Sequence, residues 1–378
     1  MTVHAFDPDA ALRSAGVKRT AVPRRIALLM PGQGAQYQGM AVGLYEREPA
    51  FTDAVDEFFV LLGREGAAIR SDWLCAHPRI DIDEAVRAQP LLFGIGYAIG
   101  RMLQDWGIEP SVLLGHSAGE YVAAVLAGVV SLEDAASQLL ERVELFQRAP
   151  AGGMLAVVAT VEQVTAFLTD EVVVGAVNGP GQLLLAGPEP QLSHVRAAME
   201  RAEITCMPAK ALRGFHSPSI IEACEASVSA FASVSLRAPS IRIISAAKPG
   251  FLDAATAKDP RFWAMVPGAP VLFGPALDLL LSQGPYLLVE AGPGQGLSVL
   301  ARRHPEVLSR RSAVLSLLGH RPGPPEADRA ALVRAIDRLV GEGYPVPAAA
   351  RERLNDPDPQ QGSNPSISAV PVPAGIAG

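Results

Sequence analysis

The chain has 378 residues, of which 49% are hydrophobic, and it carries a formal net charge of −7. This composition allows a large folded core and argues against nucleic acid or an anionic membrane as the main partner. No run approaches the roughly 18 apolar residues that span a membrane, and residues 1–25 carry charged side chains where a secretion signal would be apolar. The cysteines Cys75, Cys206 and Cys224 lack metal-binding spacing. We therefore predict a cytoplasmic globular protein that holds no metal.

The first recognisable element follows residues 1–23, which show no sustained pattern and are predicted to form a loose arm. Residues 25–30, RIALLM, form a short apolar run that is typical of a buried strand. The next six residues, PGQGAQ at 31–36, bring glycine-rich backbone to the end of that strand. This loop lacks both the G-K-[ST] of a P-loop and the G-x-G-x-x-G of a dinucleotide fold. We therefore predict that its backbone amides bind an oxyanion beside a nucleophile.

Helices are predicted over residues 40–63 and 89–106, the second with Pro90 near its start. Residues 111–128, SVLLGHSAGEYVAAVLAG, then read as a short buried strand, a G-x-S-x-G turn and a helix. Such a turn lifts the hydroxyl of Ser117 above the sheet and points the amides of the following helix at the group it attacks. The alternative is an ordinary glycine-rich turn with an incidental serine. The strand before it and the helix after it favour a nucleophile.

A further helix is predicted to begin after Ser131, because Asp134 three residues later completes a start that resembles a capping box. One stripe of this helix carries, at helical spacing, Ala135, Leu139, Arg142 and Phe146. A guanidinium among apolar neighbours needs an anionic partner or a solvated pocket. Two interpretations of Arg142 therefore remain open, a residue that binds an anionic ligand and a structural ion pair.

The pattern changes over residues 153–213, where strand, helix, two strands, helix and strand follow one another. This β-α-β-β-α-β order predicts a small ferredoxin-like subdomain. We predict that it is inserted into an α/β-hydrolase-like large subdomain with a parallel sheet, formed by residues 24–152 and 214–350. The large subdomain is further predicted to contain helices and strands over residues 219–233, 241–246, 286–290 and 330–342. Residues 355–378, rich in Pro, Ser and Gly, are predicted to be disordered.

An activated serine needs a base within hydrogen-bond reach, most often a histidine. His116 is adjacent to Ser117 in the sequence, and its side chain is predicted to point away from the serine. His216 stands where the inserted subdomain rejoins the large one, a position expected to lie in a cleft. His304 and His320 lie in stretches that are predicted to be exposed. We therefore favour His216, and since no acidic residue is clearly placed to orient it, we expect a backbone carbonyl in that role.

Together these motifs resemble the malonyl-CoA:acyl-carrier-protein transacylase family, the acyltransferases of fatty acid and polyketide synthesis. The resemblance extends over residues 26–347 and rests on seven blocks that occur in the family's order. The blocks are PGQGAQ at 31–36, AQP at 88–90, GHSAGEY at 115–121, SLEDA at 131–135 with Arg142, VNGP at 177–180, GFHSP at 214–218 and EAGPG at 290–294. The match is closer to polyketide acyltransferases than to the fatty-acid enzyme.

The resemblance implies that Ser117 is the nucleophile and His216 its base, so that the two form a dyad without a third, acidic member. It also implies that the backbone amides of Gln33 and Ala118 form the oxyanion hole. In the family the histidine is oriented by a backbone carbonyl. Here that carbonyl is expected to belong to Val266, where the family often carries Asn or Gln.

The resemblance also implies a set of substrate-binding residues. Arg142 matches the arginine that binds the free carboxylate of a malonyl-type substrate. Phe215 resembles the malonyl-selecting form of the family's specificity motif, in which a bulky ring crowds any substituent on the α-carbon. His116 and Asn178, from two of the matching blocks, complete the predicted substrate site. Ala118 is smaller than the residue that usually follows the serine, and it leaves room for a larger acyl group.

The implied reaction is a ping-pong transfer of a malonyl-type group from malonyl-CoA to the phosphopantetheine thiol of an acyl carrier protein, without a bound cofactor. The alternatives are a transferase that moves a larger acyl group between carrier proteins and an editing thioesterase of the same fold. A general esterase leaves PGQGAQ unexplained, and a non-catalytic carrier-binding module leaves Ser117, His216 and Arg142 unexplained. We predict a free-standing enzyme of polyketide biosynthesis that acts in trans, with a domain excised from a megasynthase as the rival interpretation.

Overall fold

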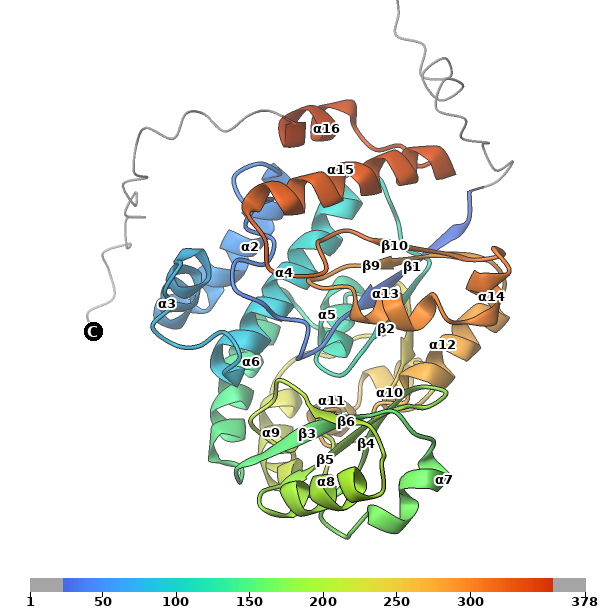
Figure 1. Cartoon of the computed structure of the whole chain (residues 1–378). Helices are drawn as coiled ribbons and strands as arrows, with labels where there is room; N and C mark the ends of the chain where they lie inside the picture. The colour runs from blue at the N-terminus through green and yellow to red at the C-terminus, as the bar shows by residue number, and fades with distance from the viewer. Residues whose placement is uncertain (1–22, 356–378) are drawn as a thin grey trace, which may run out of the picture.

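The structure, a computed structural model, describes residues 23–355 (Figure 1). The predicted arm at residues 1–23 and the predicted tail at 355–378 therefore lie outside the described residues, apart from their innermost residue. The described chain contains two separate β-sheets, one with six strands and one with four. No helix within residues 23–355 is both long and apolar enough to cross a bilayer.

The larger sheet is built from short apolar strands that are far apart in the sequence. Its order is β10-β9-β1-β2-β7-β8, and every adjacent pair is parallel except β7 with β8. The strands are β1 (Arg25–Met30), β2 (Val112–Gly115), β7 (Arg242–Ser245), β8 (Gly250–Phe251), β9 (Tyr286–Glu290) and β10 (Ala313–Ser316). The predicted parallel sheet is thus confirmed. Because parallel strands share one carboxyl edge, the loops that follow β1, β2 and β9 meet there.

Helices cover both faces of the larger sheet. Side chains alternate along each buried strand, so both faces carry apolar residues that must be covered. Leu28 and Leu113 face a core that includes residues of α2 (Pro49–Leu61), α4 (Ala85–Asp105), α5 (Gly119–Leu126), α6 (Leu132–Arg148), α15 (Pro325–Glu342) and α16 (Ala348–Asn355). Leu29 and Leu114 face the opposite core, which includes α12 (Phe273–Ser282) and α13 (Gly296–Ala301). Further helices outside the segment of the smaller sheet are α3 (Gly63–Leu74), α9 (Ile221–Ala232), α10 (Ala254–Ala257), α11 (Pro260–Met265) and α14 (Pro305–Leu308). Helices on both faces of a parallel sheet define the predicted α/β class.

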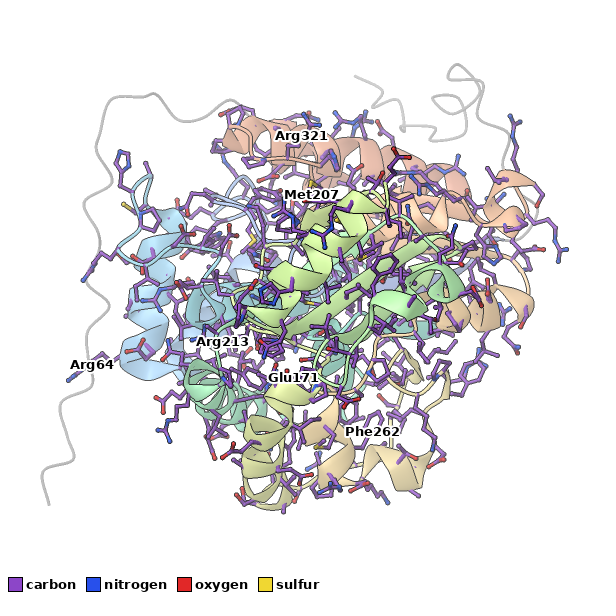
Figure 2. The ribbon with its side chains drawn as sticks, turned by 60° about the horizontal axis from the view of Figure 1, so that its bottom comes forward. Arg64, Glu171, Met207, Arg213, Phe262 and Arg321 are labelled. Atoms are coloured by element: carbon purple, nitrogen blue, oxygen red, sulfur yellow. The ribbon has the colours of Figure 1, made fainter. Side chains whose placement is uncertain are left out.

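The smaller sheet forms from the chain between α6 and α9. Its order is β4-β5-β3-β6, all antiparallel, with β3 (Gly152–Val157), β4 (Val173–Gly179), β5 (Gln182–Pro188) and β6 (Cys206–Pro208). The helices α7 (Val161–Val164) and α8 (Gln191–Arg201) complete the β-α-β-β-α-β order, so the ferredoxin-like arrangement is confirmed. In Figure 2 this sheet, in green, crosses the front of the molecule, with Met207 of β6 labelled. The boundaries at residues 153 and 213 stay a prediction.

The two sheets are joined through one short segment before α12. Ala176 of β4 forms a parallel bridge with Val271. The amide of Val177 donates to the carbonyl of Val271 over 2.8 Å, and the amide of Val271 donates to Gly175 over 2.9 Å. This segment therefore holds β4 against the carboxyl edge of the larger sheet.

The first predicted helix, residues 40–63, is wrong over residues 40–48. That stretch forms turns, and α2 begins only at Pro49. Ala41 and Glu46 lie at φ values of 60° and 63°, a backbone conformation that interrupts a right-handed helix. The apolar side chains of the stretch are nevertheless buried, which explains why their spacing suggested a helix.

The second predicted helix begins earlier than expected, because α4 already starts at Ala85. Pro90 consequently lies inside the helix, where it cannot donate a hydrogen bond to the carbonyl of Val86. The side chain of Arg87 donates to that carbonyl instead, over 3.3 Å. α15 likewise begins before its predicted start, at Pro325.

A buried carboxylate links the helix after the serine turn to the neighbouring strand. Glu120, in the first turn of α5, is 1% exposed. It accepts hydrogen bonds from the hydroxyl of Ser245 over 2.7 Å and from the amides of Ala246 and Ala247 over 2.9 and 2.8 Å. These bonds tie α5 to the end of β7. Burial nevertheless raises the pKa of Glu120 from 4.5 to about 7.

This pKa makes a prediction about stability. The folded protein holds the Glu120 proton between pH 4.5 and about 7, whereas the unfolded chain has lost it, so stability falls as pH rises through that window. Glu120→Gln removes the titration and keeps acceptors for the two amides. We expect the free energy of unfolding of the wild type to fall, relative to that of Glu120→Gln, by on the order of 2–3 kcal/mol between about pH 5 and pH 8. Urea unfolding at several pH values measures this difference, and parallel curves for the two proteins would contradict it.

Candidate active site

The serine turn between β2 and α5 brings strand and helix backbones too close for side chains. A Cβ at Gly119 would lie 2.0 Å from the carbonyl oxygen of Met30, and one at Gly115 would lie 2.2 Å from the amide nitrogen of Glu120. Ser117 itself has a φ of 54°, in the left-handed region that L-residues rarely adopt. The predicted sharp turn is therefore present, and its two glycines are required by close packing.

His216 lies against Ser117 although 99 residues separate them. The serine Oγ is 2.7 Å from Nε2 of His216. His216 also has a left-handed φ, of 64°, and its amide donates to the carbonyl of Pro267 over 2.8 Å. Its ring nitrogen Nδ1 donates to the carbonyl of Ala269 over 2.6 Å. With the proton on Nδ1, Nε2 is left as the acceptor that faces the serine hydroxyl.

A backbone carbonyl therefore holds the histidine, but it belongs to Ala269 and the expectation of Val266 is wrong. The chain does not extend directly after α11, because the amides of Gly268 and Ala269 both turn back to the carbonyl of Met265. This turn carries the histidine-facing carbonyl three residues beyond Val266. The side chain of Val266 instead lines the cavity above the serine.

The environment of His216 favours a neutral imidazole. The residue is 3% exposed, and burial lowers its pKa from 6.5 to about 4, with a smaller contribution from nearby His116. At neutral pH the ring is thus unprotonated and can take the proton of the Ser117 hydroxyl.

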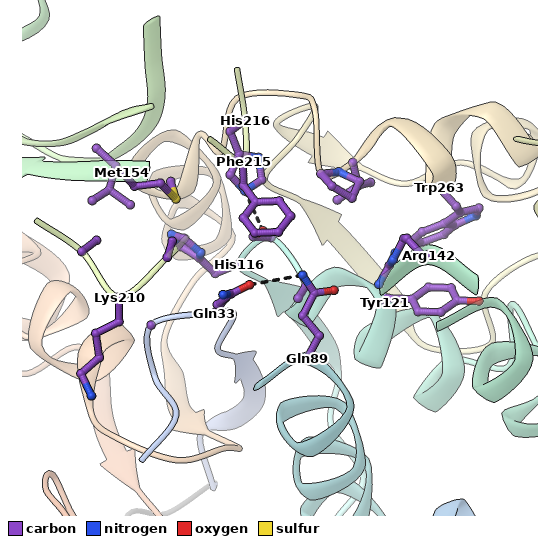
Figure 3. A pocket seen from close by; sticks show the side chains of 18 residues that line it. Gln33, Gln89, His116, Tyr121, Arg142, Met154, Lys210, Phe215, His216 and Trp263 are labelled. Atoms are coloured by element: carbon purple, nitrogen blue, oxygen red, sulfur yellow. Dashed lines mark hydrogen bonds between the residues drawn. The ribbon is translucent and has the colours of Figure 1, made fainter. Parts of the chain in front are cut away.

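The loop predicted to bind an oxyanion packs directly on the serine turn. A Cβ at Gly32 would lie 2.4 Å from the carbonyl oxygen of His116 and 3.4 Å from the amide nitrogen of Ala118. Within residues 23–355 the amides of Gln33 and Ala118 have no hydrogen-bond acceptor. The side chain of Gln33 is held by Gln89, whose Nε2 donates to Gln33 Oε1 over 3.2 Å (Figure 3). Two unused amides beside Ser117 fit the predicted oxyanion hole.

Arg142 is a buried cation without an anionic partner. It is 3% exposed, forms no ion pair with any described residue, and its Nε lacks a hydrogen-bond partner. Its guanidinium carbon lies 5.0 Å from the centre of the Tyr121 ring and 5.9 Å from that of Phe146. Burial lowers the pKa of Arg142, which is the effect of an uncompensated charge. The structural ion pair considered for this residue is therefore not formed with any residue between 23 and 355.

One cavity brings these groups together. Ser117, His216 and Arg142 all line it, with Arg142 beside Tyr121 in Figure 3. The smaller sheet contributes Met154 of β3 and Leu184 of β5, so the cavity lies between the two sheets. The remaining side chains include, among others, Gln33, Gln89, Lys210, Phe215 and Trp263. A reacting acyl group in this cavity can contact the dyad and a guanidinium at once.

The other predicted substrate residues lie at or beside this cavity. Phe215 lines it and packs edge-on against Phe146, with ring centres 5.1 Å apart and planes at 84°. His116 also lines it, and its Nε2 is 2.8 Å from Oδ1 of Asn178. Asn178 itself lines only a neighbouring cavity of about 480 Å³, which shares Gln33 and His116 with the first.

Sequence reasoning missed several residues of the cavity. Gln89 belongs to the AQP block, to which the sequence alone assigns no role, and it holds the side chain of Gln33. Trp263 and Lys210 reach the cavity from segments without a recognisable motif. Among the described residues no cluster of His, Cys, Asp and Glu is suited to a metal ion.

The chain matches known sequences over most of its length. A profile of the acyl transferase domain matches residues 28–317. One of the phenolphthiocerol/phthiocerol polyketide synthase proteins of Mycobacterium tuberculosis is 32% identical over 322 residues, which cover 85% of this chain and 22% of that protein. Polyketide synthase GfsA of Streptomyces halstedii is also 32% identical, over 85% of this chain and 4% of its own length. The chain thus spans about a fifth or less of these two relatives.

Solved structures are similar as well. The acyltransferase domain from the second module of the salinomycin polyketide synthase has a TM-score of 0.79 and 30% identity, over 93% of this chain and 84% of that one. An acyl carrier protein S-malonyltransferase from Vibrio cholerae has a TM-score of 0.67 and 25% identity, over 77% and 96%. The α/β fold with a serine turn facing a histidine defines a class of serine enzymes that handle acyl groups. Within that class the chain belongs to the acyl transferase domain family, and it is an acyltransferase of the malonyl transacylase and polyketide synthase type.

The pKa of His216 predicts how the reactivity of Ser117 depends on pH. Because the ring stays neutral down to about pH 4, we expect a fluorophosphonate probe to label Ser117 at a nearly constant rate from about pH 8 to about pH 5.5. Intact-mass measurement of the labelled protein over time gives the rate. A decline centred near pH 6.5 would contradict the buried, neutral histidine.

Proposed function

We propose that this acyltransferase moves a malonyl-type group from CoA, through an acyl-enzyme on Ser117, to the phosphopantetheine thiol of an acyl carrier protein in polyketide biosynthesis. The observation that carries this proposal is the buried guanidinium of Arg142, which has no anionic partner among the described residues and lines the same cavity as Ser117 and His216. An acyl group with a free carboxylate supplies the missing anion.

The first half-reaction follows from the distances at the dyad. His216 Nε2 accepts the hydroxyl proton as Ser117 Oγ attacks the thioester carbonyl carbon, and the developing oxyanion accepts hydrogen bonds from the amides of Gln33 and Ala118. Collapse of this intermediate breaks the carbon–sulfur bond, and the departing CoA sulfur takes the proton from His216. The acyl group then remains on Ser117 as an ester.

The second half-reaction repeats these steps with a different thiol. His216 takes the proton of the phosphopantetheine thiol, whose sulfur attacks the ester carbonyl. The serine oxygen leaves with that proton, and the acyl group is carried away as a new thioester. This chemistry uses no bound cofactor.

Arg142 is proposed to select acyl groups that carry a carboxylate. A charge-assisted hydrogen bond contributes about 1.5–3 kcal/mol, which corresponds to roughly ten- to a hundredfold in rate between malonyl and an uncharged acyl group. The gain is expected to be near the upper end, because the guanidinium is already desolvated and stacked on Tyr121.

A second candidate, transfer of a larger acyl group, is favoured by Ala118. This small residue lines the cavity next to the serine and leaves space that a bulkier side chain would fill. A related acyltransferase domain, from SpnD, has been solved in complex with 2-(pent-4-yn-1-yl)malonyl. Against a large substituent, the ring of Phe215 is held in the cavity wall by its edge-on contact with Phe146. Malonyl itself therefore remains the preferred substrate.

An acyl carrier protein and CoA are the proposed partners. A malonyl-transacylase of similar fold has been solved in complex with a type II polyketide synthase acyl-carrier protein. The neighbouring cavity opens from the same loop and is lined by Lys210, His320 and Arg321. The positive charges of Lys210 and Arg321 suit the phosphates of CoA and phosphopantetheine. Action in trans and a cytoplasmic location stay predictions from the sequence.

Arg142→Ala tests the proposed substrate. We expect formation of the malonyl-enzyme from malonyl-CoA to slow about ten- to a hundredfold, while acetyl-CoA, which has no carboxylate, reacts at nearly the wild-type rate. Stopped reactions analysed by intact mass give both rates.

Arg148→Ala is the matched control, because Arg148 lies on the exposed side of the same helix and lines neither of the two cavities. Ser117→Ala should form no adduct with either donor. Equal losses of malonyl and acetyl loading in Arg142→Ala would show that the arginine stabilises the fold and does not bind the malonyl carboxylate.

A further inference from the structure

A chain of polar contacts leads from the loop after β1, residues 31–36, to the opposite side of the cavity. The amide of Gly34 donates to Oε1 of Gln36 over 2.6 Å. Nε2 of Gln36 donates to Oδ1 of Asp83 over 2.9 Å. The other oxygen of Asp83 is 3.2 Å from Nζ of Lys210, which lies just beyond β6 of the smaller sheet. The contacts thus connect the loop after β1 with both subdomains.

Gln36 fixes the peptide that follows Gln33. Gly34 has a φ of 105°, a conformation that is costly for residues other than glycine. Because glycine adopts positive and negative φ values with similar ease, the backbone at Gly34 does not fix its own conformation. The side chain of Gln36, 2% exposed, binds the Gly34 amide and thereby sets the rotation of the peptide plane between Gln33 and Gly34. The unused Gln33 amide lies in the preceding peptide plane, which joins this one at the α-carbon of Gln33. The carbonyl of that plane, on Gly32, accepts from the amide of Ala35 over 3.3 Å. Gln36 therefore holds one of the two planes that meet at Gln33.

Gln36 needs an acceptor of its own to stay in place. A primary amide can rotate by half a turn, and the Nε2 group would then face the Gly34 amide, two donors together. The carboxylate of Asp83 accepts from Nε2 and excludes that arrangement. Asp83 is therefore the residue that decides which end of the Gln36 amide faces the oxyanion loop.

Asp83 is itself held firmly, between α3 and α4. Its amide donates to Oδ1 of Asp81 over 2.9 Å. The same connection is anchored by Asp72, which is 2% exposed and accepts from the side chain of Arg87 over 2.7 Å and from the amide of Arg79 over 2.8 Å. A fixed carboxylate can orient a neighbouring amide, whereas a mobile one cannot.

We propose that Asp83 is a positioning residue for the oxyanion hole, acting through Gln36 on the peptide between Gln33 and Gly34. The inference rests on the proposed role of the Gln33 amide. Lys210 contributes little to this positioning, because its side chain is 57% exposed and an ion pair so open to solvent is weak. The positioning of Gln36 depends on the Asp83 oxygen that accepts its hydrogen bond, and the negative charge of Asp83 is less important.

Two substitutions of Asp83 separate the acceptor from the charge. Asp83→Ala removes both, whereas Asp83→Asn keeps an oxygen that can accept from Gln36 and loses the charge. Glu200→Ala is the matched control, because it removes a half-exposed carboxylate from an ion pair on α8, outside both cavities. Thermal unfolding of all variants shows whether each one is folded.

The main readout is the rate at which a fluorophosphonate labels Ser117, since this reaction needs the oxyanion hole and contains neither malonyl nor CoA. We expect Asp83→Ala to label about tenfold more slowly than the wild type, less than the ~100-fold loss from deleting a donor outright. Asp83→Asn and Glu200→Ala should label within about twofold of the wild type. With malonyl-CoA, Asp83→Ala should lower kcat while KM stays unchanged, since the residue acts on the transition state.

Two results would overturn the inference. One is labelling of Asp83→Ala within about twofold of the wild type. The other is a loss in Asp83→Asn as large as that in Asp83→Ala, which would assign the effect to the charge and its pair with Lys210. The failure of the proposed nucleophile would look different, because Ser117→Ala would then still be labelled.

Discussion

The site depends on the close approach of three backbone segments at the carboxyl ends of β1 and β2. The loop after β1, the serine turn and the start of α5 pack so tightly that Gly32, Gly115 and Gly119 leave no space for a Cβ. This packing forces Ser117 into the left-handed region and leaves two amides beside its hydroxyl without partners in the described part of the chain. The candidate nucleophile and the candidate oxyanion hole are thus consequences of one steric constraint.

Burial then acts on His216 and Arg142, which both line the cavity, in different ways. It keeps the imidazole of His216 neutral, and a neutral ring is what a base requires. The guanidinium of Arg142 remains charged at any physiological pH, so its burial is unfavourable until an anion arrives. The same buried environment therefore suits the proposed base and the proposed carboxylate-binding residue, which line one cavity from α6 and from the loop that carries Phe215 and His216.

Much of this could be predicted from the sequence because it depends on local patterns. The serine turn, the β-α-β-β-α-β unit and the buried stripe that carries Arg142 all follow from residue spacing. The carbonyl that holds His216 could not be identified in this way, because any residue type offers a carbonyl and only the turn before Pro270 selects Ala269. Asp83 escaped notice for a related reason, since its contact with Gln36 joins segments that the sequence does not relate.

The most direct test is a crystal structure of the acyl-enzyme formed by soaking malonyl-CoA into a hydrolysis-slowed variant of the protein. We expect an ester on Ser117 whose carbonyl oxygen faces the amides of Gln33 and Ala118. We also expect that the free carboxylate lies within hydrogen-bond distance of the Arg142 guanidinium, with two parallel contacts. A malonyl carboxylate that points into solvent or pairs with Lys210, while Arg142 stays unpaired, would contradict the central claim.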